Sequence, residues 1–138
     1  MQKWFDQMKE YLKMDDEIPF KEFQEYTQGF LAYLGPELDT LVNDDLVKAR
    51  FMLSIIQGNA TDRGKRKSLE TKKYKRIVEK TTLWVDAVTY KLAKNGMSPA
   101  EIDKATQEVS DSADSADLAV SSDASGSGDA IDSPALEE

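Results

Sequence analysis

The sequence contains neither cysteine nor histidine. Without cysteine it can form no disulfide, no thiolate nucleophile and no cysteine-ligated metal site, which suits a reducing compartment such as the cytoplasm. Without histidine it lacks the commonest general base and the commonest metal ligand. Catalysis would have to rely on carboxylates, lysines or hydroxyls. We therefore expect a cytoplasmic protein that is not an enzyme and that uses neither a cofactor nor a metal.

Long apolar runs are also missing. No stretch approaches the roughly 20 consecutive apolar residues of a membrane-spanning helix, and the first residues contain no apolar run typical of a signal peptide. We therefore expect no membrane span. A chain of 138 residues has the length of one domain. A chain of this size buries about 65% of its unfolded surface, which is enough for a hydrophobic core.

The net charge of −8 is unevenly distributed along the chain. Residues 1–60 carry 6 basic and 11 acidic groups, residues 61–107 carry 12 basic and 6 acidic groups, and residues 108–138 carry 9 acidic groups and no basic one. The acidic total argues against nucleic acid as a partner. The basic middle segment, taken alone, argues for an anionic partner.

Apolar residues recur at helical spacing through most of the chain. Residues 58–64 have the composition of a loop. The run Ser98-Pro99-Ala100-Glu101 is typical of a helix start, with serine as the cap and glutamate three positions later. The pattern predicts five helices, over residues 2–14, 19–34, 36–57, 67 or 68–94, and 99–108. No segment is a credible strand, so we expect an all-α bundle of about five helices in a domain of residues 1–109.

Two features locate the core and a close contact. Residues 51–56 are apolar on almost every side, so we expect them at the centre of the core, packed against the apolar arc of the helix that contains Tyr74 and Leu92. Gly29 lies inside a predicted helix, where glycine costs up to about 1 kcal/mol relative to alanine. Its expected use is to let a neighbouring helix approach closely.

The composition changes at Ser110, after which serine, aspartate, alanine and glycine dominate. Such a segment buries too little apolar surface to offset its ordering entropy. We therefore expect residues 110–138 to form a disordered acidic tail. Its carboxylates could fold back onto a basic surface and weaken the binding of other anions.

The strongest functional signal is basic. Eight lysines and arginines fall within residues 63–76. The column Lys72, Arg76 and Lys80 places like charges one helical turn apart, where they repel unless an anion neutralises them. The candidate anion- or partner-binding residues are Arg63, Lys65, Arg66, Lys67, Lys72, Lys73, Lys75, Arg76 and Lys80.

Several roles suit this basic segment. It could contact nucleic-acid phosphates, an acidic protein or an anionic membrane surface. It could also be a solvated face whose charges balance carboxylates of the same bundle. Tyr74 is the only aromatic residue among the charges, and the helical pattern places it on the apolar side. A platform for stacking bases is therefore not indicated.

The first two helices are rich in aromatic residues, more than a small bundle can easily bury. Most should be core, and the rest could form a protein or homo-oligomer interface. The candidates are Trp4, Phe5, Tyr11 and Phe20. We therefore expect a non-catalytic helical interaction module, an adaptor or assembly factor, that uses this aromatic surface and the basic face. The alternative is a nucleic-acid-binding protein that uses the basic face and is modulated by the acidic tail.

Residues 15–23 resemble the second half of an EF-hand loop, with Ile18 and Glu22 at the hydrophobic and bidentate positions. The first half does not fit, because Tyr11 and Lys13 would occupy the first two ligand positions and Asp16 replaces the glycine of the sharp turn. We therefore expect a helix connection here, and no calcium site.

Overall fold

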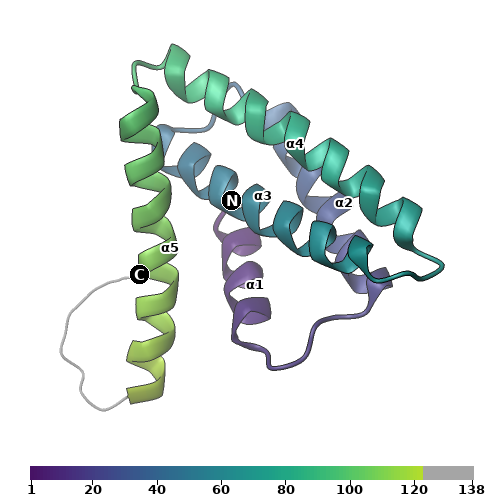
Figure 1. Cartoon of the computed structure of the whole chain (residues 1–138). Helices are drawn as coiled ribbons and strands as arrows, with labels where there is room; N and C mark the ends of the chain where they lie inside the picture. The colour runs from purple at the N-terminus through teal and green to yellow at the C-terminus, as the bar shows by residue number, and fades with distance from the viewer. Residues whose placement is uncertain (123–138) are drawn as a thin grey trace.

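The structure is a computed structural model that describes the backbone of residues 1–122 and the side chains of residues 1–113. Within residues 1–122 the chain forms five α-helices and no strand, which confirms the predicted all-α class (Figure 1). The helices are α1 (Gln2–Lys13), α2 (Phe20–Glu37), α3 (Asn43–Lys65), α4 (Thr71–Lys94) and α5 (Pro99–Ser122).

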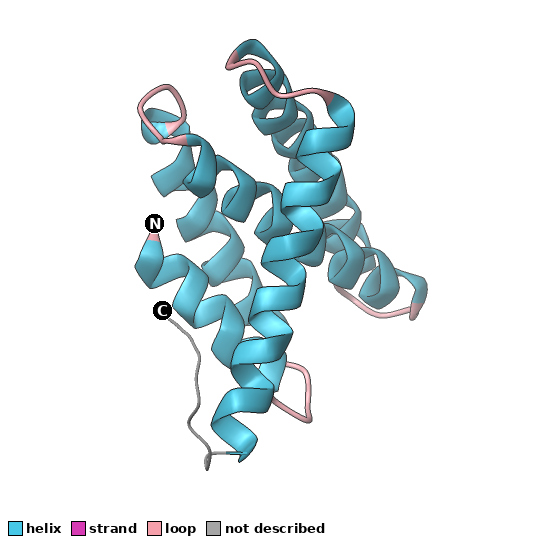
Figure 2. Cartoon of the chain, turned by 90° about the vertical axis from the view of Figure 1, so that its left-hand side faces the viewer, coloured by secondary structure: helices cyan, strands magenta, loops and turns pink. Residues whose placement is uncertain are grey.

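Helix α3 is the central element. Helix α4 runs antiparallel beside it, and the two form the most extensive helix pair in the described part of the chain (Figure 1). Helices α1 and α5 also contact α3. After a short turn, α5 crosses the end of the α3–α4 pair at a steep angle, and Figure 2 shows the face that carries α5.

One arginine of α3 joins three helices. Arg50 donates from Nε to Oγ1 of Thr89 on α4 at 3.0 Å, and from Nη1 to Oγ1 of Thr106 on α5 at 2.8 Å. Its Nη2 lies 3.3 Å from a carboxylate oxygen of Asp103 on α5. These bonds fix α5 against the α3–α4 pair. The sequence pattern did not indicate this role, because the partners of Arg50 lie 39 to 56 residues away.

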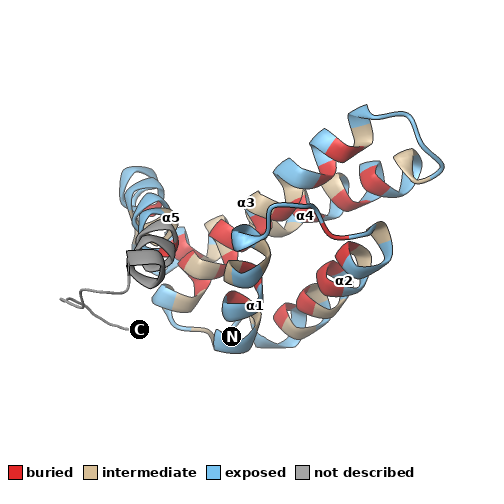
Figure 3. Ribbon diagram, turned by 90° about the horizontal axis from the view of Figure 1, so that it is seen from below, coloured by how far each residue is buried: buried red, intermediate tan, exposed pale blue. Residues whose placement is uncertain are grey.

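All five helices contribute to one hydrophobic core (Figure 3). As expected, residues 51–56 lie at its centre, and Met52, Leu53 and Ile56 are almost completely buried. Ser54 is exposed and Ile55 is half-buried, so this segment is not buried on every side. Tyr74 is buried on the inner side of α4, as the helical pattern predicts.

The boundary between α2 and α3 differs from the prediction. Helix α2 continues through Gly35 and Pro36 to Glu37, and α3 begins only at Asn43, so the expected helix start at residue 36 is wrong. Leu34 is fully buried, and the residues that follow α2 also pack against the core. This burial outweighs the local preference of glycine and proline for a turn.

The other end of α3 also differs. Residues 58–64, expected as a loop, form the last turns of a helix that ends at Lys65. Ala60 and Arg63 are buried there and continue the buried stripe of α3. Tertiary burial therefore overrides the weak helix preference of Gly58 and Asn59. As a consequence, the first basic residues lie on a helix and not on a flexible loop.

Helix α5 begins as predicted and ends later. The N–H of Glu101 donates to Ser98 Oγ at 3.1 Å, and the N–H of Ser98 donates to Glu101 Oε1 at 2.8 Å, which are the two bonds of a capping box. The helix continues past the expected end at residue 108 to Ser122, because Val109 packs against the core and Ala113 is buried. The rest of the expected tail, residues 123–138, lies outside the described residues.

Gly29 makes the close contact that the sequence predicts. The ring of Trp4 on α1 lies directly over it, between Tyr26, Phe30 and Tyr33 of α2, with ring centroids 5.6, 5.9 and 6.2 Å away. A Cβ atom on Gly29 would lie only 2.8 Å from Trp4 Cη2. The hydroxyl of Tyr26 donates to the Trp4 carbonyl at 2.7 Å and holds the two helices together.

We predict that Gly29→Ala destabilises the protein although alanine is the better helix former. The new methyl must displace a Trp4 ring held by three aromatic neighbours, and such overpacking costs about 1–3 kcal/mol. Gly58→Ala is the matched control, since Gly58 is exposed inside α3 and a Cβ there meets no atom within 4 Å. That change should stabilise the protein by up to about 1 kcal/mol. Urea unfolding measures both, and equal effects would contradict the Trp4 contact.

Candidate functional site

The structure divides the predicted basic segment among three elements. Arg63 and Lys65 lie at the end of α3, Arg66 and Lys67 lie in the connection to α4, and the other five residues lie on the first turns of α4. Those five are Lys72, Lys73, Lys75, Arg76 and Lys80. The nine candidates therefore fall into three groups along the chain, and each group has its own surroundings.

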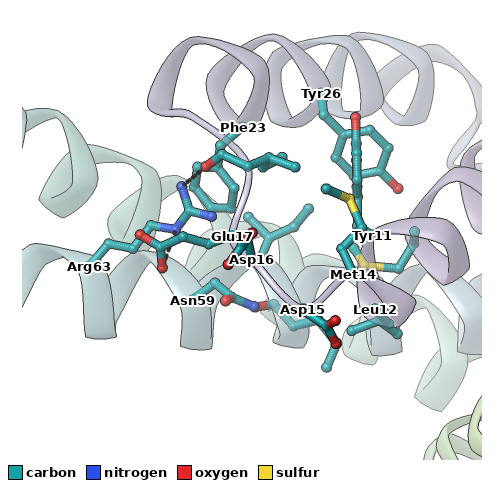
Figure 4. Close-up of a pocket in the computed structure, with 14 residues that line it drawn as sticks. Tyr11, Leu12, Met14, Asp15, Asp16, Glu17, Phe23, Tyr26, Asn59 and Arg63 are labelled. Atoms are coloured by element: carbon teal, nitrogen blue, oxygen red, sulfur yellow. Dashed lines mark hydrogen bonds and ion pairs between the residues drawn. The ribbon is translucent and has the colours of Figure 1, made fainter.

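Arg63 is an internal cation, with only 6% of its surface exposed. Its Nη1 donates to the Ile18 carbonyl at 2.9 Å and lies 3.3 Å from the Tyr74 hydroxyl. The guanidinium carbon lies 4.5 Å from the centroid of the Phe23 ring, a cation–π contact (Figure 4). Arg63 therefore ties the connection between α1 and α2 to α3 and α4, and it is not available to an external anion.

Arg66 and Lys65 have carboxylates of the chain beside them. Arg66 binds Glu17 through two parallel hydrogen bonds of 2.8 Å each, the geometry that best matches a guanidinium to a carboxylate. These bonds, together with the nearby charge of Arg63, lower the pKa of Glu17. Lys65 lies 4.0 Å from Asp62. The first part of the basic segment is therefore largely balanced by neighbouring carboxylates.

The cations of α4 differ from these. All five are exposed, and among the side chains of residues 1–113 none of them forms an ion pair. Lys73 lies over the Phe20 ring, with Nζ 5.4 Å from its centroid. Lys72 and Lys75 lie on the outer side of α4, whereas Lys73 and Lys80 lie on the flank that faces α2. The local excess of positive charge is therefore concentrated on the first turns of α4.

The predicted aromatic interface residues make contacts within the domain. Phe5 is buried, and Trp4 is enclosed by the rings of α2. Phe20 packs edge-on against Tyr74. Tyr11 donates to a Glu22 carboxylate oxygen at 3.0 Å, and burial, followed by the effect of Glu22, raises the pKa of its phenol. These aromatics account for the packing of α1 and α2.

Large apolar side chains are exposed on α4. Leu83 and Tyr90 are 69% and 70% exposed, and their spacing of seven residues places them on the same side of the helix. That side also carries Lys72 and Lys75 closer to its start. We call these four residues the outer face of α4. The exposure of Leu83 and Tyr90 could be predicted from the sequence, because both residues fall opposite the buried arc of this helix.

The segment that resembles half of an EF-hand lies beside a cavity of about 260 Å³ between α1, α2 and α3 (Figure 4). Glu22, at the bidentate position, accepts a hydrogen bond from Tyr11, and the neighbouring Glu17 binds Arg66. Among the described residues no group of three or more histidine, cysteine, aspartate or glutamate residues is placed to hold a metal ion.

None of the described helices is both long and apolar enough to span a membrane.

No known protein family, curated protein or solved structure matches the chain.

We predict that Arg63→Gln destabilises the fold by about 1.5–3 kcal/mol, the usual range for losing hydrogen bonds made by a charged group. Lys65→Gln, two residues away and exposed, should change stability by less than about 0.5 kcal/mol. The two variants lose the same charge, so urea unfolding separates burial from net charge. Equal stability of the two variants would show that Arg63 is not an internal anchor.

Proposed function

We propose that the chain is a non-catalytic helical interaction module that binds a partner protein through the outer face of α4. The observation that carries this proposal is the pair Leu83 and Tyr90, both more than two-thirds exposed and on one side of a well-packed helix. Two large apolar side chains exposed on one side of a helix offer surface that a protein partner can bury. The proposal adds α4 to the interface candidates predicted from the sequence, which are aromatic residues of α1 and α2.

The chemistry of the face defines the partner. Tyrosine is among the residues that most often dominate the energy of an interface, so Tyr90 and Leu83 fit an apolar pocket. Lys72 and Lys75 lie toward the other end of the face and would speed the encounter with an acidic surface. Glu79 and Asp86 are also exposed and lie on the same side of α4, close to Leu83, where they would repel carboxylates of a partner. The partner should therefore present an apolar pocket with carboxylates concentrated at one end.

The carboxylates support a non-catalytic role. Arg66 lowers the pKa of Glu17, and the backbone N–H of Ser98 lowers the pKa of Glu101. A general acid at neutral pH needs a carboxylate whose pKa is raised, so neither residue suits that role. Both residues also have a structural use, in the Arg66 pair and in the cap of α5.

Nucleic acid is the alternative partner, bound by the cations of α4. Tyr74 is buried, so such binding would rest on phosphate contacts alone and would fall steeply with salt concentration. An interface built on Leu83 and Tyr90 would be much less sensitive to salt.

Three further expectations stay predictions from the sequence. They are modulation by the acidic tail, a homo-oligomer and a cytoplasmic location.

Site-specific photocrosslinking in extracts of the producing organism tests the proposal. A photoreactive residue at position 83 or 90 should crosslink to the same protein, and one at the exposed position 100 of α5 should not. Equal crosslinking from all three positions, or crosslinking to nucleic acid alone, would refute the protein interface.

The purified partner then gives the quantitative test. Leu83→Ser and Tyr90→Ser should each weaken binding about tenfold or more, as expected for central interface residues. Leu12→Ser is the matched control, because Leu12 is an exposed leucine, at 39%, on another helix. Raising the salt concentration to about 300 mM, where exposed charges are strongly screened, should leave most of the binding of the wild-type chain intact.

A further inference from the structure

A groove of about 470 Å³ lies between α2 and α4, on a different side of α4 from Leu83 and Tyr90. Each helix supplies four lining residues at helical spacing, so the two walls face each other. They are Gln24, Thr27, Gln28 and Leu31 of α2, and Lys73, Arg76, Ile77 and Lys80 of α4.

All the charged residues that line this groove are positive. Three of the lining residues are cations, two are amides and none is a carboxylate. Lys73, Arg76 and Lys80 follow one another at spacings of three and four residues, where like charges on a helix repel. Among the side chains of residues 1–113 none of the three has an ion pair. An anion in the groove would relieve this repulsion.

The α2 wall of the groove includes a residue whose buried hydroxyl has no partner among the described residues. Thr27 is the most buried lining residue, with 2% of its surface exposed, and its hydroxyl has no hydrogen-bond partner among the described residues. Buried hydroxyl groups in proteins are normally hydrogen-bonded. Thr81, which is equally buried on α4, bonds to the carbonyl of Ile77 at 2.8 Å. The unpaired hydroxyl therefore distinguishes the α2 wall of the groove from an ordinary helix contact.

We propose that this groove binds a phosphorylated small molecule of about nucleotide size. Its volume falls within the range of about 300–1,000 Å³ typical of small-molecule sites. Arg76 can bind a phosphate through two parallel hydrogen bonds, and Lys73 and Lys80 flank it. Gln24 and Gln28 can each donate and accept hydrogen bonds with the uncharged part of the ligand, which would pack on Leu31 and Ile77.

The full chain, titrated with ATP and separately with inorganic triphosphate at about 50 mM salt, where charge interactions are weakly screened, tests this site. ATP should bind at least about tenfold more tightly than triphosphate, because only ATP has groups for the amides and apolar side chains. ATP binding no tighter than triphosphate would overturn the nucleotide-sized ligand. Failure of both probes to bind would overturn the site.

Two double variants of equal charge separate the groove from a diffuse basic surface. Lys73→Gln with Lys80→Gln removes two groove cations and should weaken ATP binding about tenfold or more. Lys72→Gln with Lys75→Gln removes two cations of the outer face and should change it less than about threefold. Equal losses in the two double variants would overturn the proposal.

Two further variants locate the site. Gln28→Glu places a negative charge on the α2 wall without touching α4, and it should weaken ATP binding about tenfold. Unchanged binding in this variant would overturn the placement of the ligand between the two helices. Leu83→Ser should leave ATP binding unchanged, so the groove and the protein interface on the outer face can fail independently. All these positions are exposed, and urea unfolding checks that each variant is folded.

Discussion

The buried guanidinium of Arg63 imposes the constraint on which the organisation of this domain depends. A buried cation is very costly unless it is paired or hydrogen-bonded. Nη1 of Arg63 finds its acceptors in two other segments, at the Ile18 carbonyl and the Tyr74 hydroxyl. Its Nε has no hydrogen-bond partner among the described residues and lies 3.9 Å from a carboxylate oxygen of Glu17. The two acceptors of Nη1 belong to the segment before α2 and to the first turn of α4. To reach them, α3 must stay helical through residue 63, so this contact fixes both the length of α3 and the entry of α2.

The same constraint divides the positive charge of the chain. Arg63 is buried inside the fold and is not available to an external anion. Arg66 forms an ion pair with Glu17, which lies 49 residues away in the sequence. The cations on α4 have no such partner among the described side chains. They separate further by direction, because Lys72 points outward and Lys73 lines the groove beside α2. One basic run in the sequence thus becomes a buried arginine, a surface ion pair and two groups of exposed cations on α4.

Local patterns predicted much of the fold. Helical spacing gave the number of helices, the Ser98–Glu101 pair gave the start of α5, and Gly29 gave a close helix contact. The predictions were wrong where contacts between residues far apart in the sequence determine the local structure. Residues 58–64 have the composition of a loop and are helical because Ala60 and Arg63 are buried. No local signal marks Arg50 as the residue that joins α3, α4 and α5, since its partners depend on the folded arrangement.

The candidate site was predicted only in part, for the same reason. Composition locates an excess of positive charge, but it cannot distinguish a cation buried against an aromatic ring from one exposed on the next helix. The interface at the aromatics of α1 and α2 stays a prediction, and the structure adds the exposed pair Leu83 and Tyr90 on α4. That pair could be found from the sequence by asking which apolar residues lie opposite the buried arc of a helix.

The most direct test of this division of charge is the accessibility of individual arginines in the native chain. Phenylglyoxal modifies accessible guanidinium groups, and peptide mapping assigns the modified residues. The structure predicts that Arg76 reacts readily in the native protein, whereas Arg63 reacts only after unfolding. Modification of Arg63 at the same rate as Arg76 in the folded chain would contradict the internal anchor and the account built on it.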